Sequence, residues 1–226
     1  MSNMAKPILV IAIAVVLAGG AAFYLTRSTE PEASATSDSS AGGAPAIGPG
    51  HTRGPADAPI TLIEFGDYQC PSCRAYHPVV AEVLKRYPDK VRLEFHHYPL
   101  IQIHAHAMTA SMAVEAAGEQ GKYWEMNDLV FELQPEWAQS QNPETEFLTM
   151  ASRLGLDQNK FMQSMRSLEL QDRVLKDVVA ARQGNIEAVP TFFLNGKQIQ
   201  PRLAVDDFVK IIEAELQAIG AAGAAK

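Results

Sequence analysis

Residues 60–73 read ITLIEFGDYQCPSC, a short apolar run that leads directly into a Cys-x-x-Cys motif. Residues 60–65 are mostly apolar and β-favouring, as expected for a strand buried on both faces. Over residues 74–87 the apolar side chains recur at helical spacing, so the motif is predicted to open a helix. Residues 91–95 alternate apolar and polar side chains and are predicted to form a second strand. A strand–helix–strand unit of this length predicts parallel pairing.

The two thiols of the motif, Cys70 and Cys73, are the only cysteines in the chain. In the first turn of a helix their Cα atoms would lie about 5–5.5 Å apart, within the range that a disulfide requires. A disulfide that closes about four residues gains roughly 2 kcal/mol, against about 4.7 for a loop of a hundred, so a structural staple is a poor explanation. The free amides at a helix start favour thiolate at the first cysteine. We therefore predict that Cys70 is the nucleophile and Cys73 the resolving thiol.

The composition of the chain excludes one class of partner. The chain has 226 residues, of which 47% are hydrophobic, and a formal net charge of −7. This length allows one good-sized core beyond the N-terminal segment. The Lys and Arg residues are dispersed without basic runs, so nucleic acid is not expected as a partner.

Residues 7–26 contain no charged side chain. About twenty helical residues span about 30 Å, the thickness of one bilayer core. Residues 1–27 are therefore predicted to anchor the protein in the cytoplasmic membrane; the alternative is a cleaved signal peptide, with Gly20-Ala21-Ala22 as a small-residue cleavage site. Either interpretation places the folded part outside the cytosol, where disulfides persist. Residues 28–53, rich in Ser, Ala, Gly and Pro, are predicted to be a flexible linker.

The second half of the chain is mostly helical before it returns to strand. Residues 105–184 are predicted to be an all-helical insertion, in which Gly155 and Asp157 indicate a helix stop followed by an N-cap. Residues 191–199 contain two apolar runs joined by Asn-Gly, a strong hairpin signal. A last amphipathic helix is predicted to reach residue 218, with residues 219–226 as a tail.

Four motifs follow one another within residues 54–218. They are Asp57-Ala58-Pro59-Ile60, Glu64-Phe65 with Cys70-Pro71-Ser72-Cys73-Arg74, Gly121-Lys122-Tyr123-Trp124-Glu125-Met126 and Val189-Pro190-Thr191-Phe192-Phe193-Leu194-Asn195-Gly196. In this order they resemble the DsbA-like branch of the thioredoxin superfamily. The resemblance implies an α/β thioredoxin fold with an inserted all-helical domain. It also implies a cis peptide between Val189 and Pro190 that faces the dithiol, with the backbone of Val189 pairing with an extended substrate strand.

Glu64 lies six residues before Cys70, where the superfamily carries a buried acid beneath the dithiol. An unpaired acid on a core strand is costly. The resolving thiol must lose its proton before it attacks a mixed disulfide, and the position of Glu64 suits a proton acceptor for Cys73. The alternative is a polar residue that the fold satisfies in another way.

The motif departs from the strongest oxidants of the branch, which carry a histidine between the two cysteines. Here the intervening pair is Pro71-Ser72, with no cation to stabilise the thiolate, so a milder oxidising poise is expected. His77, on the same face of a straight helix as Cys70, either favours the Cys70 thiolate slightly or is simply packed or exposed to solvent.

No metal or cofactor is expected from the sequence. A second Cys pair is absent and the histidines lack a four-ligand spacing, which argues against zinc. His104 and His106 are interpreted as surface or helix-start residues, and His96 and His97, at the end of a strand, in the same way.

The function expected is that of an extracytoplasmic thiol–disulfide oxidoreductase that donates disulfides to cysteine-containing exported proteins. A membrane or soluble redox partner would restore its dithiol. Within the same chemistry the alternative is a disulfide reductase or isomerase. From another class, the alternative is a chaperone-like module that binds unfolded segments without exchanging electrons.

Overall fold

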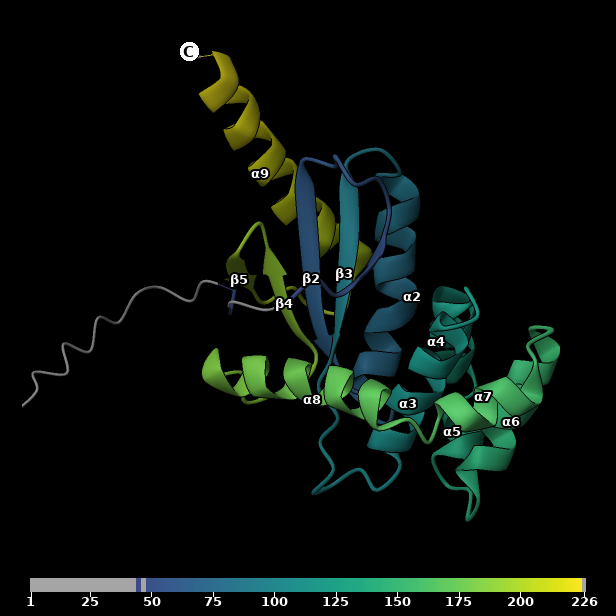
Figure 1. Cartoon of the computed structure of the whole chain (residues 1–226). Helices are drawn as coiled ribbons and strands as arrows, with labels where there is room; N and C mark the ends of the chain where they lie inside the picture. Colours follow the sequence, from purple (N-terminus) through teal and green to yellow (C-terminus); the bar gives the residue numbers. More distant parts are fainter. Residues whose placement is uncertain (1–43, 46–47, 225–226) are drawn as a thin grey trace, which may run out of the picture. The chain divides into compact units, whose positions relative to one another are not determined.

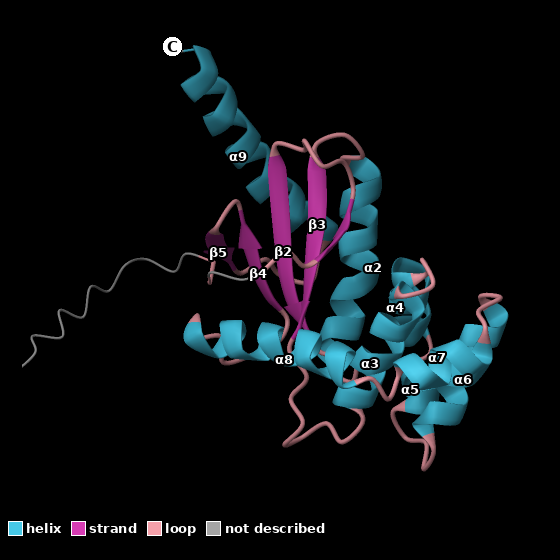
Figure 2. Ribbon diagram, viewed as in Figure 1, coloured by secondary structure: helices cyan, strands magenta, loops and turns pink. Residues whose placement is uncertain are grey.

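The computed structural model describes residues 44–45 and 48–224. These residues form a five-stranded sheet in the order β1-β3-β2-β4-β5 (Figures 1 and 2). β2 and β3 run parallel, and the other neighbouring pairs are antiparallel. The bounds are β1 His51–Arg53, β2 Ile60–Gly66, β3 Val91–His97, β4 Thr191–Leu194 and β5 Lys197–Ile199. The parallel pair and the closing hairpin agree with the sequence prediction.

Helix α2, Pro71–Arg86, connects the two parallel strands, and α9, Val205–Ala224, ends the described chain. Between β3 and β4 the chain is helical, as predicted for the insertion. Its helices are α3 Ala107–Gly118, α4 Tyr123–Glu132, α5 Gln134–Trp137, α6 Pro143–Arg153, α7 Gln158–Ser164 and α8 Leu168–Gln183. Gly155 has φ +72° after α6, and the Asp157 side chain caps α7 by accepting from the Lys160 amide. Both predicted signals are therefore confirmed.

The two faces of the sheet are covered by different helices, because side chains alternate along each strand. Ile60 and Leu62 of β2 pack in one cluster with Val80 and Val83 of α2 and with Phe208 of α9. Phe65 of β2, on the opposite face, packs in another cluster with Val178 and Ala181 of α8. Figure 1 shows α8 crossing the end of the sheet near the other insertion helices. The result is a sheet between two helical layers.

The insertion has its own apolar core, which reaches the dithiol. Trp137, Phe147 and Phe161 are fully buried in a cluster that also contains Cys70 and Cys73. The motif at the start of α2 therefore lies where the thioredoxin part meets the insertion.

Two predicted boundaries are wrong in detail. Residues 51–53, assigned to the flexible linker, form β1 and pair with Leu93–Phe95 of β3. These residues form a strand because they pair with the edge of β3, which is distant in sequence. The composition of the segment gives no sign of that pairing. At the other end, α9 continues to Ala224 and includes most of the predicted tail.

The predicted membrane segment, residues 1–27, lies outside the described residues. Within residues 44–45 and 48–224, no helix combines the length and the apolar character that a membrane span requires.

Candidate active site

Cys70 is the N-cap of α2, directly after the turn that leaves β2. Pro71 occupies the first helical turn, where its missing amide hydrogen costs nothing and its fixed φ suits the helix. The helix then brings Cys73 one turn further, under the first thiol. The local sequence alone therefore places the two thiols next to each other.

The two thiols differ in their access to solvent. Cys70 is 8% exposed and Cys73 is fully buried, and both are free. The Cys70 thiol donates to the carbonyl oxygen of Val189 across 3.7 Å, and the backbone amide of Asp67 donates to the Cys73 sulfur across 3.5 Å. Only the first sulfur can therefore meet an incoming sulfur atom without a rearrangement of the helix.

Their pKa values are shifted in opposite directions. The hydrogen bond from the Cys73 thiol, assisted by the backbone amides of Cys73 and Ser72, lowers the pKa of Cys70 from 9.0 to about 6, although burial opposes the shift. Burial, followed by the hydrogen bond to Cys70, raises the pKa of Cys73 well above its ordinary value. At neutral pH the first cysteine is therefore the thiolate and the second the proton donor, which matches the predicted assignment of nucleophile and resolving thiol.

Glu64 lies on the face of β2 that carries Ile60 and Leu62 and is covered by α2. It is 4% exposed, and desolvation raises its pKa from 4.5 to about 8. Its negative charge is among the causes that raise the pKa of Cys73. Glu64 also lines a cavity of about 10 Å³, close to the minimum volume for one water molecule. The burial predicted for this acid is therefore confirmed.

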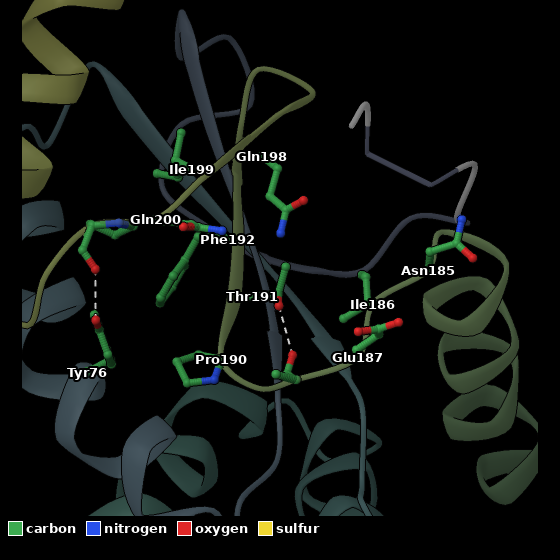
Figure 3. A pocket seen from close by; sticks show the side chains of 12 residues that line it. Tyr76, Asn185, Ile186, Glu187, Pro190, Thr191, Phe192, Gln198, Ile199 and Gln200 are labelled. Carbon is green, nitrogen blue, oxygen red and sulfur yellow. Dashed lines mark hydrogen bonds between the residues drawn. The ribbon is translucent and has the colours of Figure 1, made fainter. Parts of the chain in front are cut away.

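The Val189–Pro190 peptide is cis, as the resemblance implied, and faces the dithiol through the carbonyl of Val189. Beside it lies a pocket of about 370 Å³ whose wall comes from α2, the segment before β4, β4, β5 and the residues after β5 (Figure 3). Tyr76 of α2 donates from its hydroxyl to the carbonyl of Pro201 across 2.8 Å and closes one side of this pocket. Gln198 and Gln200 add amide side chains to the wall.

Sequence reasoning missed three side chains that hold the turn before Cys70. Gln134 donates to the carbonyl oxygens of Tyr68 and Cys70 across 2.6 Å and 3.0 Å. Gln69 accepts from the His106 amide across 2.7 Å. Asp67, fully buried, accepts from the Gln69 amide across 2.7 Å. Only Asp67 gave a signal, as an acid beside an apolar strand and close to the motif.

The histidines fall into different environments. His106 is the N-cap of α3, as predicted for a helix-start residue, whereas His104 contacts Asp67 beside the dithiol. His77 stacks on Phe131 and lies 3.3 Å from the Asp128 carboxylate, which agrees with the packing interpretation.

His96 and His97 are 0% and 1% exposed, so the surface interpretation of this pair is wrong. Acidic side chains of β3, α3 and α8 contact them. Among the described residues, no group of three or more His, Cys, Asp or Glu side chains is arranged to hold a metal ion.

Comparison with known proteins adds the family. Residues 47–214 match the model of a thioredoxin family, described as "Thioredoxin". The chain belongs to the DsbA-like branch of the thioredoxin superfamily. Among solved structures, this DsbA-like chain resembles oxidised BdbD from Bacillus subtilis at 26% identity and a TM-score of 0.68, covering 78% of this chain and 98% of BdbD. DsbA1 from Wolbachia pipientis has the same fold at 23% identity and a TM-score of 0.64, covering 74% and 92% of the two chains.

Curated relatives match over a smaller share of their length. A Na(+)/H(+) antiporter NhaA 3 of Salinispora tropica is 38% identical over 148 residues, which are 66% of this DsbA-like chain and 22% of the antiporter. The chain thus spans about a fifth of the length of the curated relatives that it matches. The match therefore concerns one region of those proteins.

Proposed function

We propose that this DsbA-like chain is a thiol–disulfide oxidoreductase that passes a Cys70–Cys73 disulfide to reduced cysteines of exported proteins. The observation that carries the proposal is the asymmetry of the dithiol at a helix start that faces the Val189 carbonyl. A thiol of low pKa, with 8% of its surface exposed, stands above a fully buried thiol of high pKa. A thiolate of low pKa is a good leaving group in disulfide exchange and stabilises the reduced form of the enzyme.

The reaction follows from this asymmetry. A substrate thiolate attacks the Cys70 sulfur of the oxidised enzyme, breaks the Cys70–Cys73 bond and forms a mixed disulfide. Cys73 leaves as a thiolate and takes up a proton. A second substrate thiolate then attacks the substrate sulfur of the mixed disulfide, and Cys70 leaves as the thiolate. The substrate loses two electrons and gains one disulfide, and the enzyme gains two electrons.

Glu64 is proposed to exchange the proton of Cys73. When the resolving thiol attacks a mixed disulfide, its proton needs an acceptor; in the opposite direction the same group returns the proton. Desolvation raises the pKa of Glu64 to about 8, so both protonation states are accessible near neutral pH. The small cavity beside Glu64 offers space for one water molecule through which this proton exchanges with the solvent.

The backbone of Val189, held beside Cys70 by Pro190, is proposed to pair with an extended segment of the substrate. This role is supported by the distance of 3.7 Å between the Cys70 sulfur and the Val189 carbonyl oxygen. Backbone pairing makes few demands on sequence, so it suits an enzyme that acts on many unfolded polypeptides.

The compartment is proposed to be extracytoplasmic, with residues 7–26 as a membrane anchor and a second redox protein restoring the disulfide. The uncharged stretch in the sequence supports the anchor. The compartment is supported by the chemistry, because disulfides formed by an oxidase persist only in an oxidising environment. Mass spectrometry of the mature N-terminus tests the anchor: an intact start supports it, and a start near Phe23 would replace it by a cleaved signal peptide.

The main test is a redox titration of residues 28–226 against glutathione, with the thiols read by alkylation and mass shift. We expect a reversible disulfide and a potential between about −120 and −200 mV, because the low Cys70 pKa favours the reduced form while no cation lies between the cysteines. A potential well below about −200 mV would instead favour the reductase or isomerase.

Matched cysteine variants distinguish the oxidoreductase hypothesis from the chaperone-like binding module. Cys70→Ser should abolish oxidation of a reduced model protein, whereas Cys73→Ser should trap a mixed disulfide through Cys70. If the double cysteine variant still suppressed aggregation of an unfolded protein and the parent formed no reversible disulfide, the chaperone-like module would replace the enzyme.

A further inference from the structure

The turn between β2 and α2 contains a fully buried carboxylate that the reaction above does not use. Asp67 has both carboxylate oxygens occupied: Oδ1 accepts from the Gln69 amide across 2.7 Å, and Oδ2 accepts from the Leu100 amide across 2.9 Å. These amides satisfy hydrogen bonds but bring no full positive charge. A buried carboxylate without a cation carries a large desolvation cost.

Among the described residues, one basic side chain reaches Asp67. His104, in the loop of residues 98–106 between β3 and α3, lies with Nδ1 2.7 Å from Asp67 Oδ2. Its side chain is only 17% exposed, so solvent weakly screens the contact. The loop is attached at its other end as well, because the His106 amide donates to Gln69 Oε1 across 2.7 Å.

This pair is also connected directly to the dithiol. The Asp67 amide donates to the Cys73 sulfur across 3.5 Å, and its carboxylate contacts the residue just before Cys70. The negative charge of Asp67 opposes the thiolate at Cys70 and raises its pKa. Glu64, in its ionised form, adds a second negative charge, which acts on Cys73. The ionisable groups facing the dithiol are therefore Asp67, Glu64 and, through Asp67, His104.

We propose that His104 is a positioning residue that balances the buried charge of Asp67 and thereby sets the redox poise of the Cys70–Cys73 pair. When His104 is protonated, it forms an ion pair with Asp67 that has no net charge toward the dithiol. Without it, a bare carboxylate faces the Cys70 thiolate, disfavours the reduced enzyme and makes the protein a weaker oxidant. The motif has no cation between its cysteines, and a protonated His104 in another loop would offset a nearby negative charge instead.

Because His104 and Asp67 carry opposite charges in the proposed pair, substituting one or the other should shift the Cys70 pKa and the redox potential in opposite directions. His104→Asn retains a side-chain donor near the position of Nδ1 but cannot become positive, so it should raise the thiolate pKa of Cys70 and lower the potential. Asp67→Asn removes the negative charge, so it should lower that pKa and raise the potential. The double variant removes both charges and should return close to the parent. A purely structural pair would shift both single variants in the same direction.

The experiment measures two quantities on residues 28–226 of each variant: thiolate absorbance at 240 nm against pH, and the equilibrium constant with glutathione. We expect shifts of about three- to tenfold in that constant, which correspond to about 15–30 mV for a two-electron couple. His106→Asn is the matched control, because His106 lies in the same loop and its side chain makes no hydrogen bond or ion pair with the described residues.

The result that would overturn the proposal is a shift of both single variants in one direction, or no shift in His104→Asn. If Asp67→Asn does not fold, the other two variants still test the proposal. His104→Asn should lower the redox potential, and His106→Asn should leave it unchanged. The inference depends on the proposed function only through a reversible disulfide. If neither the parent nor any variant formed a reversible disulfide, the proposed function itself would fail. If all of them formed one with the same potential, only the role of His104 would be contradicted.

Discussion

Cys70 and Cys73 are chemically identical, and their surroundings alone make them different. The first sulfur accepts hydrogen bonds at the start of α2, and the second is covered by the core of the insertion. Stabilisation of one thiolate and desolvation of the other separate the two pKa values. This separation defines which thiol reacts with the substrate.

The first prediction concerns the hydrogen bond between the two thiols. Cys73→Ala removes the donor that contributes most to the low pKa of Cys70, so the thiolate midpoint should rise above about 6. Cys73→Ser retains a hydroxyl donor and should remain closer to the parent. Thiolate absorbance at 240 nm against pH measures both midpoints in the reduced proteins. Equal midpoints in the two variants would show that the helix amides alone lower the pKa.

The second prediction concerns the cost of burying Glu64. Its pKa in the folded state, about 8, lies above the ordinary value of 4.5, so the folded protein should lose stability as pH rises from 4.5 to 8. Glu64→Gln cannot ionise and should be more stable than the parent at pH 7, by on the order of 3 kcal/mol. Urea unfolding at pH 5 and pH 8 measures the difference, which should be smaller at pH 5.

Glu82→Gln, on an exposed position of α2, is the control and should show no such dependence on pH. The same Glu64 variant should also flatten the pH profile of thiol exchange with glutathione. A variant with unchanged stability and an unchanged profile would contradict both the buried charge and the proton-exchange role.

At the scale of the elements, α8 is attached to β3 by a charged histidine. His96, fully buried, lies 3.0 Å from Asp177 Oδ1 and 3.0 Å from Glu94 Oε1, and the second oxygen of Asp177 accepts from the His97 amide. Burial alone would lower the pKa of His96, but the hydrogen bonds to the two acids outweigh it and raise the pKa to about 9. The helix that covers one sheet face thus depends on an ion pair as well as on apolar contacts.

The third prediction tests this link with Asp177→Asn. The variant loses the charge and one of the two acceptor oxygens that bind His96 and the His97 amide, so its free energy of unfolding at pH 7 should fall by about 2 kcal/mol. In the parent, the contribution of His96 is fully present below pH 6.5 and is lost as pH rises through about 9. The variant should therefore lose less stability than the parent between pH 6.5 and pH 9 in urea unfolding.

Asp172→Asn provides a control on the same helix, because Asp172 forms an exposed pair with Lys176. Exposed pairs contribute little, so this change should stay within about 0.5 kcal/mol of the parent. An equal loss in the two variants would contradict a specific role for the buried link.

At the scale of the whole molecule, one carboxylate of the insertion holds parts of the thioredoxin sheet. Glu115 of α3, fully buried, accepts from His51 of β1 across 2.8 Å and from His97 of β3 across 2.9 Å. Its other oxygen accepts from Arg173 of α8 across 2.8 Å. Burial would raise the pKa of Glu115, but the hydrogen bonds from His51 and His97 outweigh it and hold the pKa well below its usual range.

The fourth prediction is the effect of Glu115→Gln on the stability of the whole protein. Removing one partner of a buried charged network should cost about 3 kcal/mol at pH 7. Because the folded pKa of Glu115 is lowered, its contribution is present above pH 4.5 and lost as pH falls further, so parent and variant should converge in acid. Urea unfolding at pH 7 and pH 3.5 measures this. Glu119→Gln, at a half-exposed contact with Arg173, should have a much smaller effect.

The sequence by itself determined the features that depend on near neighbours along the chain. The apolar, β-favouring run of residues 60–65, the helical spacing after Cys73 and the Asn195-Gly196 turn each report local geometry, and the structure has β2, α2 and the β4–β5 hairpin there. The closeness of the two thiols follows in the same way from one helical turn. A short window of residues contains all the information that such features need.

Only the tertiary structure decided which charged side chains are buried and what they contact. His97 meets an acid 18 residues away, His104 meets one 37 residues away, and β1 pairs with a strand about 40 residues later. The free energy of a buried charge depends on partners brought together by the fold, and no window of sequence shows them. Three histidines that looked like surface residues, His96, His97 and His104, therefore contact buried or partly buried acids in the folded protein.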